Sequence, residues 1–246
     1  MKVKSNIPYK YVESYGRLEE IIDSTEVFEK VSVVPNSESL TYKNGYYIDC
    51  YSIFIDIRES SKLPDKYQRP TLAKIYRAYI SEIVAIFQSY QECKEINIVG
   101  DSVWAIFEAN TKIDVLKVFS AAYTSQSLIH FLNYKLENKK IDQIKTGIGI
   151  SKGRALMIKA GFKGSGINDI IYMGQVVNRA SKLCSKANKD VQYGLVIDND
   201  TYNALEGYDN DLGSLYQDMF EKSPEDYYYG TIIRVDMDQW LAMKQK

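Results

Sequence analysis

The chain has 246 residues, of which 45% are hydrophobic and 26% are charged, which predicts a soluble globular protein with a sizeable core. Its formal net charge is −1, so we expect no general affinity for nucleic acid or anionic membranes. No apolar stretch reaches the roughly 18 residues that span a bilayer. The opening sequence, MKVKSNIPYK, lacks the apolar core of a signal peptide, which predicts a cytoplasmic protein.

The chain has few cysteines and histidines, which argues against several kinds of metal, disulfide and catalytic site. The three cysteines, at positions 50, 93 and 184, are widely spaced, which predicts reduced thiols rather than a disulfide framework or a zinc site. The single histidine, His130, argues against a Ser-His-Asp triad and against a multi-histidine metal site. It lies in the apolar sequence SLIHFLNYKL, and we interpret it as a packing residue.

The N-terminal part of the chain predicts an extension before the main domain. Apolar residues recur at helical spacing over residues 9–30, which predicts one or two helices for packing or dimer contact. Asn44-Gly45 predicts a hairpin turn between two β-prone segments. We therefore expect a helical extension over residues 1–44 and one catalytic domain over residues 45–246.

The main domain alternates predicted strands and helices. YSIFIDI, residues 51–57, predicts a buried strand, and residues 70–91 predict a helix with apolar residues every three or four positions. EINIVGDSVWAIFE predicts a hairpin, and residues 111–136 predict another helix. IKTGIGISKGRALMIKAG predicts a pair of strands with a Ser-Lys-Gly turn, and GFKGSGIND predicts a loop. After this loop, MGQVVNRASKLCSKA predicts a helix, YGLVID and YYYGTIIRV predict strands, and the chain ends in a predicted helix. This order predicts an α+β fold, a mostly antiparallel sheet with helices packed on it.

Two acids stand out in this pattern. Asp56 ends a predicted strand and Asp101 occupies a predicted hairpin tip, so the two carboxylates meet at one sheet edge if these strands are neighbours. Adjacent carboxylates repel unless a cation lies between them, and hard oxygen ligands suit Mg²⁺ or Mn²⁺. Alternatively, Asp101 caps a turn and Asp56 merely ends a strand. The sequence after Asp56 predicts a helical turn near Ser60 and Ser61, whose N–H and hydroxyl groups can bind phosphate, and this favours a metal–triphosphate site.

Four segments together resemble the class III nucleotidyl cyclase family. FIDIRESS is similar to its F-x-D-I-x-x-S/T element, and VGDSVWAIF is similar to its G-D-x-x-x-x-x-F hairpin. TGIGISKGRAL resembles its G-I-x-x-G strand pair, and GQVVNRASKLCSKA resembles its G-x-x-V-N-x-A-x-R-L helix. The segments occur in the family's order, and the resemblance covers about residues 45–235.

The resemblance implies a ferredoxin-like sheet that acts as a head-to-tail homodimer with active sites at the interface. One subunit would bind two divalent cations, Mg²⁺ or Mn²⁺, through Asp56, Asp101 and the backbone carbonyl of Ile57. The implied reaction is attack of the ribose 3′-oxygen on the α-phosphorus of a nucleoside triphosphate, with loss of pyrophosphate. The substrate-binding residues assigned to the strand and turn around Asp56 are Phe54, Arg58, Ser60 and Ser61.

The other subunit would supply the residues that steady the reacting phosphate. Asn178 matches the family asparagine, and Lys182 stands where the family has arginine. Residues four apart share a helix face, so both can point at one ligand; the alternative is a solvated polar face without a role in catalysis. Lysine lacks the two-pronged contact of arginine, so Arg179 is a second candidate for the catalytic cation.

The base-reading positions depart from the family's purine enzymes. Adenylate cyclases usually have a lysine at the position of Asn97 and an aspartate or threonine at that of Ile171. Asn97 carries a donor and an acceptor that can serve cytosine, uracil or adenine, and Ile171 adds bulk that favours a smaller base. In this respect the chain resembles the stand-alone pyrimidine cyclases of bacterial anti-phage (Pycsar) systems, whose cyclic CMP or cyclic UMP is read by a separate effector protein. On general likeness, CTP is favoured over UTP.

Two other functions stay open. One is an adenylate or guanylate cyclase with an atypical base pocket. The other is a catalytically inactive cyclase-like domain that binds a nucleotide as a sensor; Lys182 favours it, whereas the presence of both acids and Asn178 argues against it.

Overall fold

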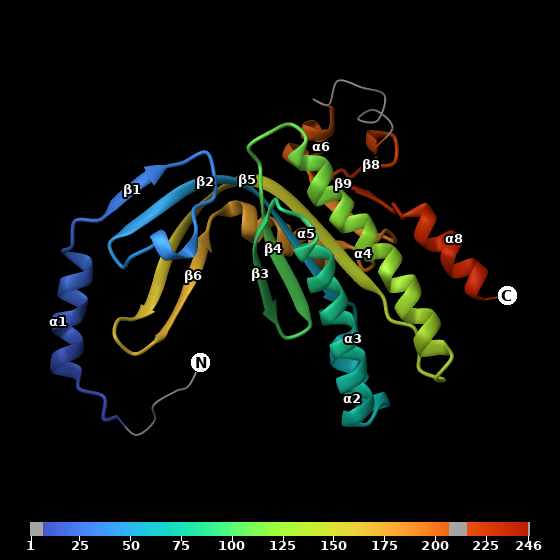
Figure 1. Cartoon of the computed structure of the whole chain (residues 1–246), viewed down its shortest axis with the longest axis horizontal. Helices are drawn as coiled ribbons and strands as arrows, with labels where there is room; N and C mark the ends of the chain where they lie inside the picture. Colours follow the sequence, from blue (N-terminus) through green and yellow to red (C-terminus); the bar gives the residue numbers. More distant parts are fainter. Residues whose placement is uncertain (1–6, 207–215, 246) are drawn as a thin grey trace. The chain divides into compact units, whose positions relative to one another are not determined.

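The computed structural model describes residues 7–206 and 216–245, which fall into two compact units (Figure 1). The smaller unit holds residues 7–48 and 154–174, and the larger unit holds the rest. Two long strands, β2 (Asn44–Ile57) and β5 (Thr146–Phe162), contribute residues to both units. The boundary expected after residue 44 remains a prediction, and the smaller unit takes in the later segment 154–174 as well.

The larger unit is built on the element order β-α-β-β-α-β. These elements are β2, α3 (Arg69–Gln88), β3 (Cys93–Val99), β4 (Ser102–Glu108), α4 (Asp114–Glu137) and β5. Their strands lie in the order β3-β4-β2-β5, which is the ferredoxin-like arrangement. Beyond β5 the sheet continues through β7 (Leu195–Asp198), β9 (Tyr227–Gly230) and β8 (Glu221–Lys222). In this unit the β5–β7 pair is parallel and the other described registers are antiparallel, so the predicted α+β class is confirmed.

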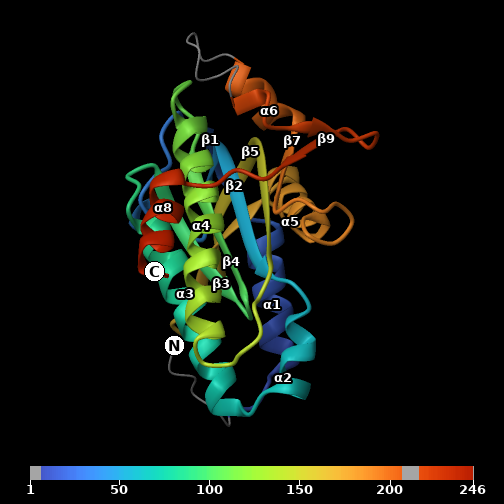
Figure 2. The same cartoon turned by 90° about the vertical axis from the view of Figure 1, so that its right-hand side faces the viewer.

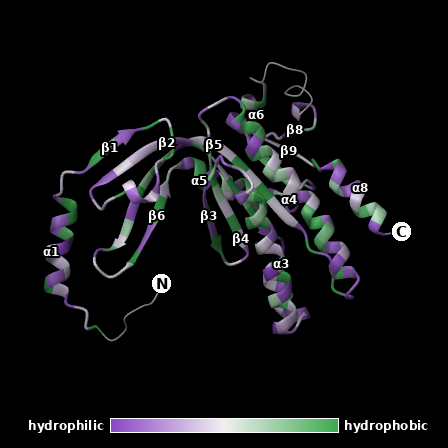
Figure 3. Cartoon of the chain, in the orientation of Figure 1, coloured by the Kyte–Doolittle hydropathy of each residue, from purple (hydrophilic) through white to green (hydrophobic). Residues whose placement is uncertain are grey.

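The main core lies between this sheet and helices α3 and α4. Ile53, Ile55 and Ile57 of β2 are each at most 2% exposed, as expected for alternate residues that share one face of a strand. They cluster with Phe87 of α3 and Phe119 of α4, and burial of each such side chain contributes roughly 2 kcal/mol. Figure 2 shows α3 and α4 side by side, and Figure 3 shows hydrophobic and hydrophilic residues alternating along both. This layer fixes the strand ends that carry the candidate site.

Helix α5 (Gln175–Lys186) packs on the opposite face of the sheet. Leu183 of α5 clusters with Val196 of β7, whereas Leu195 and Ile197, the neighbours of Val196, belong to the core under α3 and α4. The helix approaches β5 very closely, because a Cβ atom on Gly149 would lie 2.2 Å from the carbonyl oxygen of Ala180. A glycine in the TGIGI sequence thus permits the position of α5.

Several short helices complete the larger unit. They are η2 (Ser60–Lys62), α2 (Leu63–Lys66), α6 (Asn199–Glu206) and α8 (Val235–Lys244). Helix α8 lies beside α4 (Figures 1 and 2). The prediction that His130 packs in an apolar environment is wrong, because its side chain is 48% exposed and its Nδ1 lies 2.9 Å from Oδ1 of Asp238. His130 faces outward on α4 and contacts α8 through this polar bond.

In its described residues, the smaller unit combines an α-helix and a 3-10 helical turn with two whole strands and parts of two others. Its elements are α1 (Tyr11–Ile22), β1 (Val27–Lys30), η1 (Ser37–Ser39), β6 (Ile167–Met173), the start of β2 and the end of β5. The helix predicted over residues 9–30 is confirmed only within α1, because residues 27–30 form a strand that pairs in parallel with β2. Asn44 and Gly45 begin β2 and do not form a hairpin turn. A Cβ atom on Gly45 would lie 2.9 Å from side-chain atoms of Ile158 and Phe28, so a larger residue there would displace these side chains.

Strand β5 is continuous where a Ser-Lys-Gly turn is predicted. The turn comes later, at Gly164 and Gly166, which have φ values of 83° and 75°. Residues from Ile167 onward form β6, so the predicted GFKGSGIND loop is confirmed only in its first part. The strand predicted in YYYGTIIRV ends at Gly230. The predicted Ser-Lys-Gly turn is wrong because Gly153 lies inside β5, where an extended strand tolerates glycine.

The structure also bears on the cysteines and on membrane-spanning helices. Cys50, Cys93 and Cys184 are all free thiols, as predicted. Within residues 7–206 and 216–245, no helix combines the length and the apolar character needed to cross a bilayer.

Candidate active site

The structure brings Asp56 and Asp101 to the same edge of the sheet. Asp56 lies near the end of β2, and Asp101 lies in the tight turn between β3 and β4. The turn is permitted by Gly100, whose φ is 64°, and β2 pairs with β4 up to Ile55 and Val103. Burial, and then the negative charge of Asp101, raise the pKa of Asp56 to about 6. A side-chain hydrogen bond with Asp101 acts in the same direction, so the two carboxyl groups are in contact.

This pair has the chemistry of a divalent-cation site. Oδ2 of Asp101 is buried and has no hydrogen-bond partner among the described residues, and such an acceptor normally needs a partner. Mg²⁺ and Mn²⁺ are often held by one or two carboxylates together with water and substrate phosphate. Ile57, whose carbonyl is the third predicted ligand, buries its side chain in the core, which anchors the strand end. The residues present therefore fit the implied cations.

Arg58 turns toward the protein interior. Its side chain is 11% exposed, and its Nη2 lies 3.2 Å from Oδ2 of Asp56. The same nitrogen lies 3.4 Å from Sγ of Cys184 on α5. Arg58 thus contacts a candidate metal ligand from the interior side, and its role in substrate binding stays a prediction.

A helical turn follows Asp56 at the predicted place. It is η2, and it begins after Glu59, whose φ of 54° is left-handed. Ser61 is exposed, whereas Ser60 is half-buried and hydrogen-bonds to Tyr76 of α3. Burial, and then the charge of Asp101, raise the pKa of Tyr76, and the Ser60 bond acts in the opposite direction. Tyr76 is therefore a neighbour of the carboxylate pair that the sequence motifs do not identify.

Three side chains form a row across β3, β4 and β2. Asn97 lies opposite Trp104, and Trp104 lies opposite Phe54. The Phe54 and Trp104 rings stack with centroids 5.3 Å apart and planes 5° apart, on the sheet face opposite the one covered by α3 and α4. Nδ2 of Asn97 is buried and lacks a hydrogen-bond partner in the described part of the chain. An unpaired amide beside an aromatic surface is suited to recognise a nucleobase.

Asn178 and Lys182 occupy the outward side of α5. Both are exposed, whereas Val176, Ala180 and Leu183 are buried, so the polar face deduced from the sequence is present. Within residues 7–206 and 216–245, no hydrogen bond or ion pair links Asn178 or Lys182 to the carboxylates of Asp56 and Asp101. Ile171, the other predicted base reader, lies on β6 in the smaller unit and is 39% exposed.

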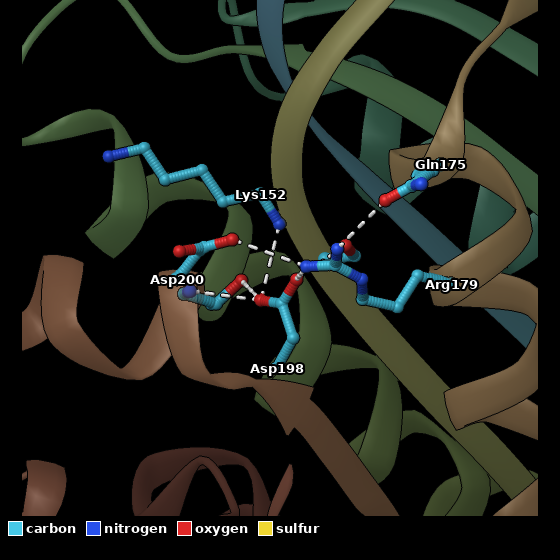
Figure 4. Close-up of polar contacts among 7 residues, drawn as sticks. Lys152, Gln175, Arg179, Asp198 and Asp200 are labelled. Carbon is cyan, nitrogen blue, oxygen red and sulfur yellow. Dashed lines mark hydrogen bonds and ion pairs between the residues drawn. The ribbon is translucent and has the colours of Figure 1, made fainter. Parts of the chain in front are cut away.

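Arg179 is held by acidic side chains (Figure 4). Its Nη1 lies 2.9 Å from Oδ2 of Asp198 and 3.2 Å from Oδ2 of Asp200. Asp198 is 3% exposed and also accepts hydrogen bonds from the Ser151 and Thr201 hydroxyls, both at 2.6 Å. Such a satisfied buried carboxylate gives Arg179 a structural partner.

Sequence reasoning missed Tyr76, Trp104 and Cys184 as neighbours of the site. Trp104 lies in the VGDSVWAIF segment, and the alternation of residues from Asp101 onward could have placed it on the open face. Cys184 lies six residues after Asn178 on the buried side of α5. Tyr76 carries no comparable signal, because its position depends on where α3 crosses the sheet edge.

Comparison with known proteins gives consistent matches. Residues 44–222 match the family described as adenylate and guanylate cyclase catalytic domain. The chain is 38% identical to a uridylate cyclase of Gulbenkiania mobilis, over 96% of this chain and 97% of that protein. It is 34% identical to a uridylate cyclase of Treponema porcinum, over 96% of this chain and 83% of that protein. A cytidylate cyclase of Staphylococcus aureus is 28% identical, over 66% of this chain and 39% of that protein.

The fold is similar to that of a class III adenylyl cyclase-like ATP-binding protein from Pseudomonas aeruginosa. The TM-score is 0.70 at 18% identity, over 95% of this chain and 50% of that one, a likeness that concerns the fold alone. The family match spans most of the chain, and two relatives exceed 30% identity over nearly all of it. The chain therefore belongs to the adenylate and guanylate cyclase family, the class III nucleotidyl cyclases, which generally depend on divalent cations and commonly dimerise.

Proposed function

We propose that this cyclase converts a pyrimidine nucleoside triphosphate, UTP first and CTP second, into its 3′,5′-cyclic monophosphate and pyrophosphate. The observation that carries the proposal is the Asp56–Asp101 pair, in which Oδ2 of Asp101 is buried without a partner among the described residues. The names of the two relatives that match nearly the whole chain support UTP. A shorter match to a cytidylate cyclase supports CTP as the second candidate, although the sequence alone favours CTP.

In the proposed reaction, the ribose 3′-oxygen forms a bond to the α-phosphorus. The bond from the α-phosphorus to the bridging oxygen of the β-phosphate breaks, and the hydroxyl proton passes to solvent. Two divalent cations, Mg²⁺ or Mn²⁺, bound by Asp56, Asp101 and the Ile57 carbonyl would lower the pKa of the attacking hydroxyl and neutralise the leaving group. Ser60 and Ser61 begin the helical turn η2 after Asp56, and their hydroxyl and N–H groups would hold phosphate oxygens.

The site is proposed to form between two copies of the chain. Asn178 and Lys182 stand on the exposed side of α5 with no bond to the carboxylates in the described structure. A head-to-tail homodimer would place them against the Asp56–Asp101 pair of the second copy. There the Lys182 ammonium stabilises charge that develops on the transferring phosphate, and Asn178 orients the nucleotide. Arg179 is less suited to this role because Asp198 and Asp200 already hold it.

Asn97 supports the choice of base. Its buried Nδ2 is a donor without a partner in the described residues, and a base carbonyl can satisfy it. Uracil offers two carbonyl oxygens on its ring and cytosine offers one, which favours UTP.

Incubation of the pure protein with each of the four nucleoside triphosphates and Mn²⁺ tests the proposal. We expect cyclic UMP as the main product, cyclic CMP as a minor one, and neither from Asp56→Ala. Cyclic AMP or cyclic GMP alone would contradict the pyrimidine assignment. No product from any substrate would leave a nucleotide-binding sensor.

The resemblance to Pycsar cyclases extends the proposal to a signalling role. The cyclic nucleotide would act as a messenger in anti-phage defence, read by a separate effector protein. Phage challenge of cells that carry this chain with its neighbouring genes, compared with cells that carry Asp56→Ala, tests this role. Equal phage sensitivity in the two strains would contradict it.

A further inference from the structure

Arg58 is a largely buried arginine that joins three elements of the larger unit. Its Nη2 donates to Oδ2 of Asp56 at 3.2 Å, to the Asp56 carbonyl at 3.3 Å and to Sγ of Cys184 at 3.4 Å. The Cys184 thiol donates to the carbonyl oxygen of Gly147 at 3.1 Å. The backbone N–H of Arg58 donates to the carbonyl oxygen of Lys145 at 2.8 Å. Through its backbone N–H and its side chain, Arg58 therefore connects the end of β2 with the segment that enters β5 and with helix α5.

The space for this arginine depends on Gly147. A Cβ atom there would lie 2.8 Å from Nη2 of Arg58 and 2.6 Å from the carbonyl oxygen of Cys184. Any larger residue would therefore displace the guanidinium or α5. Burial raises the pKa of Cys184 to about 12, so the thiol stays neutral and can accept from Arg58 while it donates to Gly147.

Burial of the Arg58 guanidinium lowers the stability of the fold unless its interactions with other groups offset the cost of desolvation. Its Nε is buried with no hydrogen-bond partner among the described residues, and an incompletely satisfied buried cation is usually less favourable than an apolar side chain. Its ion-pair partner is Asp56, and Asp56 in turn faces Asp101. Two of the three hydrogen bonds of the Arg58 side chain go to Asp56, and they fix the orientation of its carboxylate.

We propose that Arg58 is a positioning residue, which orients the Asp56 carboxylate for metal binding and ties it through Cys184 to helix α5. This inference rests on the proposed function in taking Asp56 as a metal ligand and, for the link to α5, in taking Asn178 and Lys182 as residues of a shared site. Groups that hydrogen-bond to ligating carboxylates raise metal affinity, and their loss costs about 10–100-fold. The role differs from the substrate contact predicted from the sequence, because the guanidinium lies on the interior side of Asp56.

The tie to α5 has a second consequence. Asn178 and Lys182 stand on this helix, and in a head-to-tail dimer they serve the active site opposite to the one that contains Asp56. The contacts of Arg58 and Cys184 therefore link the candidate metal ligand Asp56 to helix α5. We expect Mn²⁺ to slow amide hydrogen exchange in residues 175–186 of the wild-type protein.

Mn²⁺ binding, followed by electron paramagnetic resonance of the free ion, tests the positioning role without turnover. We expect Arg58→Met to weaken Mn²⁺ binding at least tenfold and Arg58→Lys to recover part of the loss. The matched control Arg77→Met changes an exposed arginine of α3 and should bind Mn²⁺ as the wild type does. At saturating Mn²⁺, the KM for UTP should change less than twofold in Arg58→Lys. Wild-type Mn²⁺ affinity in Arg58→Met, or a raised KM with unchanged Mn²⁺ binding, would overturn the proposal.

Substitutions of Cys184 give a second test that remains valid if Arg58→Met does not fold. Cys184→Ala leaves Arg58 in place and removes its contact with α5, whereas Cys184→Ser keeps an acceptor at that position. We expect Mn²⁺ to slow exchange in α5 of the wild type and Cys184→Ser but not of Cys184→Ala, and equal responses in all three would overturn the tie. Because Mn²⁺ binding that is lost in Asp56→Ala identifies the ligand independently of turnover, failure to make cyclic nucleotide would contradict the proposed function alone.

Discussion

Nη1 of Arg179 lies 2.9 Å from Oδ2 of Asp198, whose side chain is 4% exposed. Three residues further along the same helix, Lys182 is exposed and forms no ion pair within the described residues. The side chains of Arg179 and Lys182 therefore have different roles. Arg179 balances a buried carboxylate, and Lys182 is available to a nucleotide.

Paired substitutions separate these roles. Arg179→Met should lower the free energy of unfolding by about 1–2 kcal/mol, less than for a fully buried pair because Arg179 is 41% exposed. Lys182→Met should leave that free energy within about 0.5 kcal/mol of wild type and lower kcat for UTP at least 100-fold. Urea unfolding and initial rates with Mn²⁺ measure the two effects. If Lys182→Met retained wild-type kcat, the assignment of Lys182 as the catalytic cation would be wrong.

The raised pKa of Asp56 predicts how pH affects the metal-free protein. The fold raises the pKa of Asp56 from its usual 3.8 to about 6, so the folded state binds more protons than the unfolded state between these values. The stabilising contribution of protonated Asp56 is fully present below pH 4 and is lost as the pH rises through 6. Asp56→Asn removes this titration.

We therefore expect the Tm of Asp56→Asn, measured in EDTA, to rise relative to that of wild type between pH 4 and pH 7. Asp142→Asn serves as a control, because Asp142 is an exposed acid whose pKa is lowered by its hydrogen bond to Lys66. For this control the difference should run in the opposite direction or be too small to measure. Parallel Tm curves for wild type and Asp56→Asn would show that the fold does not raise the pKa of Asp56.

Much of the site follows from local sequence because its main residues sit at element ends. Asp56 and Asp101 could be placed together since one ends a strand and the other occupies a hairpin tip, and strand pairing brings such positions to one edge. Asn178 and Lys182 share a helix face by their spacing. These relationships depend only on the periods of strands and helices.

The direction of Arg58 could not be predicted in the same way. Its inward position depends on space left by Gly147 and on Cys184, which lies 126 residues away in the chain. The parallel pairing of β1 with β2 was missed for a similar reason, since residues 27–30 have no local feature that excludes a helical continuation. Packing between distant segments decides both cases.

Asn97 provides a test of base recognition. Asn97→Asp keeps the shape of the side chain and replaces its donor with acceptor oxygens. The variant should lower kcat/KM for UTP at least tenfold, since a buried acceptor would then face a base carbonyl. Asn110→Asp, at an exposed position after β4, should not change it. Equal kcat/KM values for UTP in wild type and Asn97→Asp would remove Asn97 from the base site.

Mixing of two inactive variants tests the shared site. In the proposed shared site, Asp56→Ala removes a metal ligand and Asn178→Ala removes a residue of the other half, so each homodimer would have two defective sites. A heterodimer of the two rebuilds one intact site, and random exchange should restore about a quarter of wild-type activity. Native mass spectrometry of subunits with different tags measures the heterodimer fraction.

The matched control for this mixing is Asp56→Ala with Asp101→Ala. Both changes fall on the same half of the site, so every site in their heterodimer lacks one carboxylate and activity should stay at background. Recovery in this control would mean that wild-type subunits contaminate the mixture or that one carboxylate suffices. Failure of Asp56→Ala and Asn178→Ala to complement, while their heterodimers form, would show that Asn178 acts within its own subunit.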